Sequence, residues 1–323
     1  MLGLLVTLLS AASCALAATR TSPPSGAVVV RQSGTQSGEF STVSAAVASL
    51  SGTSSRSIFI YPGSYKEQVL IEYKGPLTIY GYTNDTTSYK NNQVTITNNL
   101  NAQDNGGNDP CATVRAHSAS FNMYNINVAN TYGQGKQATA LATKAGKQGY
   151  YGCKFTGYQD TLLADGGDSA TQYYSNCYIQ GAVDYVYGSA SAWFGEECTF
   201  DSIGGGAITA NSRDSTASTS YYVIDSSTIT STSSTSLTSK VYLGRPWRQY
   251  ARVVFQRSKL PALINPAGWT TLANPANPIF MEFNNTGDGS STASRVNETK
   301  QTALIDHGTV LGSDYSTWVD TSY

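Results

Sequence analysis

Residues 153–188 read CKFTGYQDTLLADGGDSATQYYSNCYIQGAVDYVYG, and this stretch carries one pattern twice. The pattern Cys-x-(Phe/Ile)-x-Gly-x-x-Asp fits residues 153–160 and again residues 177–184, so the second copy begins 24 residues after the first. An aromatic pair precedes the cysteine of each copy. If each copy is one turn of a repeating coil, the aspartates that close the two copies, Asp160 and Asp184, lie one above the other.

The repeat extends beyond these two copies. Four segments align by their apolar positions and begin 27, 24 and 21 residues apart: residues 126–130, 153–157, 177–181 and 198–202. In each segment the first and third residues are apolar and the second is polar, as a strand with one buried face requires. Short strands that end in Asn or Gly at this period predict an all-β chain folded as a right-handed parallel β-helix. A β-sandwich or barrel is the alternative, although sandwiches do not usually repeat a motif at this spacing.

The two ends of the chain depart from the repeat. Residues 41–50 place four apolar side chains on one helical face behind a serine cap: Val43, Ala46, Val47 and Leu50. This short helix is expected to plug the open end of the solenoid. Short β-rich runs follow at residues 57–61, 77–82 and 93–97. Residues 302–323 lose the repeat and are expected to form a tail packed on the coils.

Composition indicates a secreted, extracellular protein. Residues 1–17 are apolar and end in Ala-x-Ala, which predicts a signal peptide followed by a single catalytic domain over residues 18–323. No later run is long and apolar enough to span a bilayer, so no membrane anchor is expected. Charged residues make up 13% of the chain and the net charge is −1, which argues against nucleic acid as a partner. We expect a monomer, with three sequons on surface loops, at Asn84, Asn284 and Asn297.

Four cysteines remain once the signal peptide is removed: Cys111, Cys153, Cys177 and Cys198. A secreted protein could pair them as disulfides in three ways. Three of the four recur at coil-like intervals, however, and this favours buried free thiols in successive coils. Zinc binding is disfavoured because the sequence has no Cys-x-x-Cys pair and only two histidines. We expect no metal and no cofactor.

Two stacked carboxylates have a chemical consequence. At about 4 Å, two unit charges repel by roughly 4 kcal/mol at an effective dielectric constant near 20. The repulsion is usually relieved when one carboxyl keeps its proton, which leaves an acid beside a base or nucleophile. A structural role for Asp160 and Asp184, as caps of exposed turns, is the alternative. Gln137 and Gln159 could donate hydrogen bonds to a developing oxyanion, and Arg245 could hold one aspartate ionised.

Five blocks of this sequence resemble, in order, the signature blocks of the pectin methylesterase family: residues 63–67, 137–141, 157–162, 181–188 and 243–247. The resemblance covers roughly residues 27–315. Tyr185 and Tyr187 stand where the family often has Phe, and this change alters no expected catalytic position.

The resemblance implies a right-handed parallel β-helix that acts on methyl-esterified homogalacturonan, the methyl-esterified polygalacturonate of pectin. It implies that Asp184 is the nucleophile of an acyl-enzyme mechanism and that Asp160 is the general acid and then the base. It further implies that Gln137 and Gln159 are the oxyanion donors and that Arg245 holds Asp184. Glu67 is expected to be structural. Three aromatic side chains are expected to contact the substrate: Trp247, Tyr158 and Tyr187.

Other functions remain as alternatives. A β-helix polygalacturonase would cleave the sugar chain with two or three carboxylates, but the sequence has no Gly-His-Gly motif. A calcium-dependent lyase would need a carboxylate cluster and an arginine base. A Ser-His-Asp hydrolase is disfavoured because no Gly-x-Ser-x-Gly motif is present. A non-catalytic wall-binding solenoid would tolerate the loss of both aspartates.

Overall fold

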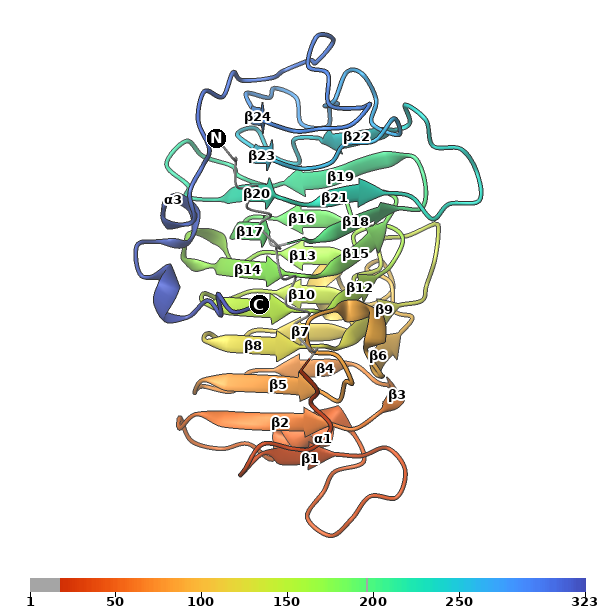
Figure 1. Cartoon of the computed structure of the whole chain (residues 1–323), viewed down its shortest axis with the longest axis vertical. Helices are drawn as coiled ribbons and strands as arrows, with labels where there is room; N and C mark the ends of the chain where they lie inside the picture. The colour runs from red at the N-terminus through yellow and green to blue at the C-terminus, as the bar shows by residue number, and fades with distance from the viewer. Residues whose placement is uncertain (1–17, 196) are drawn as a thin grey trace, which may run out of the picture.

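Three parallel β-sheets run along the molecule and form the walls of a parallel β-helix (Figure 1). The structure is a computed structural model that describes residues 18–195 and 197–323. The predicted signal peptide at residues 1–17 lies outside the described residues. Each complete coil contributes one strand to each sheet in turn, and every strand pair within the sheets is parallel.

The strands of each sheet follow one another along the molecule as they do along the chain. The first sheet contains β1 (Val28–Val30), β2 (Arg56–Ile60), β5 (Leu77–Gly81), β8 (Phe121–Tyr124), β11 (Gln148–Tyr151), β14 (Thr171–Ser175), β17 (Ser191–Gly195), β20 (Tyr221–Asp225), β23 (Arg252–Gln256) and β24 (Ile279–Phe283). The second sheet contains β3 (Gly63–Lys66), β6 (Val94–Asn98), β9 (Asn127–Asn130), β12 (Lys154–Thr156), β15 (Tyr178–Gly181), β18 (Thr199–Ser202) and β21 (Thr228–Thr230). The third sheet contains β4 (Val69–Ile71), β7 (Val114–Ala116), β10 (Leu141–Thr143), β13 (Leu162–Ala164), β16 (Val186–Gly188), β19 (Gly206–Asn211) and β22 (Val241–Gly244).

The four repeated segments of the sequence contain neighbouring strands of the second sheet, β9, β12, β15 and β18. Lys154 of β12 pairs with Asn127 of β9 on one side and with Tyr178 of β15 on the other, and Tyr178 pairs with Thr199 of β18. This is the register that aligns the four repeated segments, so the predicted β-helix is confirmed.

The repeated cysteines lie one residue before these strands and face the interior. Cys153, Cys177 and Cys198 are buried and free, as predicted, and Cys111 is also buried and free. The Cys177 thiol donates to the carbonyl oxygen of Tyr150 in the preceding coil at 3.4 Å. Burial raises the pKa of the Cys177 thiol well above its ordinary value, so this thiol stays neutral inside the coils.

Aromatic side chains of the first sheet stack along the interior. The rings of Tyr150 and Tyr174 lie 4.9 Å apart, and those of Tyr174 and Phe194 lie 4.5 Å apart. These spacings match the distance of roughly 4.8 Å between neighbouring strands, so a parallel register brings like rings into offset contact in successive coils. The stack fixes the register of the coils and therefore the alignment of the corners that connect them.

Helix α1 (Val43–Ala48) covers the N-terminal end of the coils, as predicted, and contacts β1, β2 and β4. It is shorter than residues 41–50, and its cap is Thr42 rather than a serine: the Thr42 hydroxyl accepts the Ala45 N–H. The Glu67 carboxylate accepts the N–H groups of Val43 and Ser44 at 2.9 and 2.8 Å. Together these acceptors satisfy the first turn of the helix, which gives Glu67 the structural role expected of it.

The C-terminal residues pack on the outer face of the first sheet, again as predicted. Helix α3 (His307–Leu311) contacts β14, β17 and β20, and η3 (Tyr315–Thr317) follows it. Further on, Asp320 accepts a hydrogen bond from the Tyr124 hydroxyl at 3.0 Å. Three short elements lie in connecting loops: η1 (Tyr89–Asn91), α2 (Asn108–Cys111) and η2 (Gly167–Ser169). Within residues 18–195 and 197–323, no helix is long and apolar enough to cross a membrane.

Candidate active site

Asp160 and Asp184 occupy the same corner of successive coils, between the second and third sheets. A bridge pairs Gln159 with Val183 in parallel, and the Asp160 N–H donates to the Val183 carbonyl oxygen at 3.0 Å. Both aspartates adopt left-handed backbone conformations, with φ of 62° and 49°. Aspartate is among the few non-glycine residues enriched in this region. The two corners share this backbone conformation and both side chains line one cavity, which confirms that the repeat stacks the aspartates.

Arg245 follows β22, the last strand of the third sheet, and forms a two-point ion pair with Asp184. Its Nε lies 2.8 Å from Asp184 Oδ1 and its Nη2 lies 2.7 Å from Oδ2. The Arg245 N–H also donates to the Thr209 carbonyl oxygen at 3.0 Å, which anchors the residue to β19. The pair engages both oxygens of Asp184, so this carboxylate is fixed in orientation.

Asp160 is in a different electrostatic state. Its pKa is raised to about 8, first because the side chain is buried and second because of the negative charge of Asp184. Arg245 and a hydrogen bond from Asn108 oppose this shift without cancelling it. Near neutral pH Asp160 therefore keeps its proton beside the carboxylate that Arg245 pairs, and a protonated carboxyl is what general acid catalysis requires.

A cavity of about 250 Å³ opens over the two aspartates. It is lined by all five predicted catalytic residues and two of the three predicted substrate-contact residues: Gln137, Gln159, Asp160, Asp184, Arg245, Trp247 and Tyr187. Sequence reasoning missed three further lining residues: Asn108, Ala210 and Leu272. They belong to no repeated block, so the spacing of the repeat gave no signal for them.

The two glutamines reach the cavity from successive coils. The Gln159 carbonyl oxygen accepts the Ala138 N–H at 3.0 Å, which fixes the chain around Gln137 against the chain around Gln159. The Gln137 side-chain oxygen accepts a hydrogen bond from the Gln103 amide. This contact uses the oxygen of the Gln137 amide and neither of its two N–H donors.

Of the three aromatic side chains expected to contact the substrate, two line the cavity. The Tyr187 and Trp247 rings lie 5.8 Å apart in the cavity lining, and the Tyr187 hydroxyl is hydrogen-bonded to Thr139 at 2.7 Å. Tyr158 is not among the lining residues, and its hydroxyl lies beside Gly204. Consecutive residues in extended chain face opposite sides, so a Gln159 side chain in the cavity turns Tyr158 away from it. The substrate contact expected of Tyr158 therefore stays a prediction.

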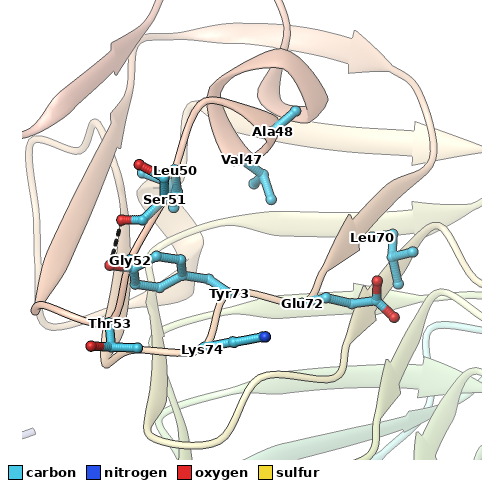
Figure 2. A pocket seen from close by; sticks show the side chains of 10 residues that line it. All are labelled: Val47, Ala48, Leu50, Ser51, Gly52, Thr53, Leu70, Glu72, Tyr73 and Lys74. Atoms are coloured by element: carbon cyan, nitrogen blue, oxygen red, sulfur yellow. Dashed lines mark hydrogen bonds between the residues drawn. The ribbon is translucent and has the colours of Figure 1, made fainter.

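A larger cavity of about 610 Å³ lies at the N-terminal end of the coils, beside α1 (Figure 2). Glu72 and Lys74 are the charged side chains in its lining, and the Tyr73 hydroxyl donates to the Ser51 carbonyl oxygen across it at 3.4 Å. Its lining holds a single carboxylate, that of Glu72, and no arginine, so this cavity has neither the paired carboxyls nor the ion pair of the smaller one.

Among the described residues, no group of three His, Cys, Asp or Glu side chains could hold a metal ion.

Comparison with known proteins agrees with this geometry. The profile of the Pectinesterase family matches residues 27–311. The probable pectinesterase A of Aspergillus niger is 51% identical over 305 residues, which cover 94% of this chain and 91% of that protein. The pectinesterase A of Emericella nidulans is 52% identical over 305 residues, with 94% and 91% covered.

Solved structures give the same result. The deglycosylated pectin methylesterase from Aspergillus niger superposes with a TM-score of 0.91 at 50% identity and covers 95% of this chain and 100% of that chain. The pectin methylesterase from carrot superposes with a TM-score of 0.81 at 30% identity, with 92% and 96% covered. The chain therefore belongs to the pectinesterase family of carboxylic ester hydrolases.

Proposed function

We propose that this pectinesterase hydrolyses the methyl esters of polygalacturonate through a covalent acyl-enzyme, with Asp184 as nucleophile and Asp160 as general acid and then base. The observation that carries the proposal is the unequal state of two stacked carboxyls. Arg245 engages both oxygens of Asp184, while burial and the charge of Asp184 raise the pKa of Asp160 to about 8. Such a corner supplies a nucleophile and an acid at the same pH.

In the first half-reaction, an Asp184 oxygen attacks the carbonyl carbon of the methyl ester. The carbonyl oxygen becomes an oxyanion, which the amide groups of Gln137 and Gln159 stabilise by donating hydrogen bonds. Asp160 then gives its proton to the departing methoxyl oxygen, so methanol leaves. The galacturonyl carbonyl stays bound to Asp184 as an anhydride, and Asp160 is left ionised.

In the second half-reaction, ionised Asp160 takes a proton from a water molecule that attacks the anhydride carbonyl. The bond to Asp184 breaks, and the products are the original Asp184 carboxylate and a galacturonic acid group, which releases its proton to solvent and becomes the free carboxylate. Asp160 ends protonated, and the net reaction consumes one water per methanol. We assign this chemistry to the chain's own residues, with no metal or cofactor taking part.

Trp247 and Tyr187 are proposed to contact the sugar. The half-buried Trp247 side chain lines the cavity beside the nearly buried Tyr187 ring. An open indole face beside carboxylates suits a sugar ring, because the ring's C–H groups pack on the indole while its hydroxyls stay in water. Together with membership of the pectinesterase family, such a contact supports methyl-esterified homogalacturonan as the substrate class.

We further propose that residues 18–323 act as one secreted, monomeric catalytic domain after removal of residues 1–17. Asn84, Asn284 and Asn297 are exposed, so each sequon is accessible to glycosylation. Mass spectrometry of the protein secreted by a fungal host would test both the cleavage point and the glycan positions.

Methanol release from highly esterified pectin tests the proposed activity. The wild-type enzyme should release methanol while the number of reducing ends stays constant, because an esterase leaves the glycosidic bonds intact. New reducing ends would favour the polygalacturonase alternative. The absence of both products would favour a non-catalytic solenoid.

Arg245→Ala is expected to lower kcat by about 10²-fold or more, with a smaller change in KM, because the nucleophile loses the contacts that orient it. Steady-state kinetics on esterified pectin measure the split between kcat and KM. Arg31→Ala is the matched control, since it breaks a similar two-point pair with Glu39 (2.7 and 2.9 Å). That pair lies in the N-terminal coils, remote from the cavity, and its loss should leave kcat unchanged. A change in KM alone for Arg245→Ala would indicate a substrate contact instead.

A further inference from the structure

The side chain of Asn108, which lies in a loop between strands, also contacts Asp160, the candidate acid. Its Nδ2 donates a hydrogen bond to Asp160 Oδ2 at 3.2 Å, and the side chain lines the same cavity. We propose that Asn108 is a positioning residue for the esterase reaction. It determines which oxygen of Asp160 carries the proton and favours the ionised form that Asp160 takes after methanol leaves. This inference rests on the proposed role of Asp160 as acid and base.

The segment that carries Asn108 is firmly held. Asn108 begins α2, and Gly107 before it has φ of 125°, a left-handed conformation that glycine adopts without strain. The next residue, Asp109, accepts hydrogen bonds from Arg115 Nη2 at 2.7 Å and binds His117 Nε2 at 2.8 Å. Arg115 belongs to β7 of the third sheet, and His117 follows that strand directly. The segment is therefore tied to the wall that carries the candidate site.

A second tie fixes the other end of α2. The Gln68 amide donates to the carbonyl oxygens of residues 110 and 112 at 2.7 and 2.9 Å. The first set of contacts is made by the side chain of Asp109, and the second by the main-chain carbonyls of residues 110 and 112. Neither set involves the Asn108 side chain. The Asn108 amide is thus left for its contact with Asp160, which makes the contact a property of a rigid segment.

The direction of this hydrogen bond selects the proton's position on Asp160. A protonated carboxyl has one carbonyl oxygen that accepts and one hydroxyl that donates. Asn108 donates to Oδ2 and a carbonyl oxygen accepts better than a hydroxyl oxygen, so this contact favours the proton on Oδ1. After proton transfer Asp160 is a carboxylate, and hydrogen bonds to a charged acceptor are stronger than those to a neutral one. Asn108 therefore stabilises the base form more than the acid form.

The two charged neighbours of Asp160 shift its pKa in opposite directions. The negative charge of Asp184 raises its pKa and the positive charge of Arg245 lowers it. Two titratable groups also interact with it, the Cys111 thiol of α2 and the Tyr187 hydroxyl of β16, and burial raises the pKa of both. Both are therefore neutral through the range in which Asp160 titrates. Asn108 is the neutral side chain that shifts this balance towards the ionised form.

The pH dependence of kcat/KM on esterified pectin tests the inference. The loss of activity at alkaline pH reports the deprotonation of Asp160 in the free enzyme. In Asn108→Ala this alkaline limb should move up by about one pH unit, because the ionised form loses a donor. At neutral pH kcat should fall about tenfold, since proton transfer from Asp160 to the methoxyl oxygen leaves a carboxylate that has lost a donor, with KM changed less than about twofold.

Asn108→Asp separates this role from a merely structural one. Aspartate has the same shape as asparagine, so a structural role predicts less damage than in Asn108→Ala. Our inference predicts a larger upward movement of the alkaline limb, because a second negative charge then faces Asp160. Asn105→Ala is the control: its amide donates to the Asn101 carbonyl oxygen in the same loop at 2.9 Å, and its loss should leave the limb in place. Thermal unfolding of each variant shows that it is folded.

Two outcomes keep the inference distinct from the assignment of Asp160. If Asp160→Asn loses the alkaline limb while neither Asn108 variant moves it, the role of Asn108 is wrong and that of Asp160 stands. If Asp160→Asn keeps both the limb and near-wild-type turnover, the proposed mechanism is wrong and the inference falls with it.

Discussion

Asp184→Asn is expected to release no measurable methanol from highly esterified pectin, with kcat lowered by at least about 10⁴-fold. The carboxylate that Arg245 holds through both oxygens becomes an amide, which cannot attack an ester carbonyl. Binding of the substrate should change far less, since the Trp247 and Tyr187 faces of the cavity are untouched. Methanol assays over several hours, with wild type in parallel, measure the loss.

A fold-preserving control accompanies this variant. Asparagine keeps the shape of aspartate and can still accept one hydrogen bond from Arg245, so the coils should remain intact and thermal unfolding should stay cooperative. Mass spectrometry of wild type mixed rapidly with substrate should show an added galacturonyl mass, and Asp184→Asn should show none. Equal methanol release by the two proteins would rule out Asp184 as the nucleophile.

Asp160→Asn is expected to lower kcat by about 10²- to 10⁴-fold and at the same time to stabilise the fold at neutral pH. The activity falls because an amide neither protonates methanol nor activates water. The stability rises because Asp160 ionises near 3.8 in the unfolded chain but at about 8 in the folded one. Between these values the folded state holds an extra proton, so rising pH favours unfolding by a few kcal/mol. Asparagine has no such dependence.

The effect on stability is measured by the Tm of wild type and of Asp160→Asn, determined by thermal unfolding at a series of pH values. The wild-type Tm should fall relative to that of Asp160→Asn as pH rises from about 4 to about 8, and the difference should level off above that. In the wild type, kcat/KM should decline through the same pKa as Asp160 loses its catalytic proton. A Tm difference that is constant with pH would show that Asp160 is not a buried acid, whatever happens to activity.

The sequence predicted the parts of the site that depend on the coil repeat. Asp160 and Asp184 share a repeat position, and a parallel register carries equal positions to equal corners, so their stacking follows from their spacing alone. The contact of Arg245 with Asp184 was implied by a family resemblance, because 61 residues separate the two and no local rule relates them.

Other parts could not be predicted, for physical reasons. Asn108 and Leu272 reach the cavity from loops between the strands, and loop paths depend on contacts that no periodicity records. Tyr158 was expected to offer an aromatic face to the substrate; it lies outside the cavity lining, and its contact with the substrate stays a prediction. The cap of α1 was placed on a serine, but the hydroxyl of Thr42 reaches the Ala45 N–H and serves instead.

The left-handed corner shared by Asp160 and Asp184 gives the reaction centre a translational symmetry. Each coil ends its second-sheet strand and turns into its third-sheet strand, so neighbouring coils differ by a shift of roughly 4.8 Å along one axis with little rotation. A polymer with repeating units can lie along such an axis and meet equivalent corners in succession. The corners between the second and third sheets thus repeat along the axis, and two neighbouring corners carry the aspartates Asp160 and Asp184. Whole coils added or removed at either end would lengthen or shorten the surface under the polymer while leaving those two sites unchanged.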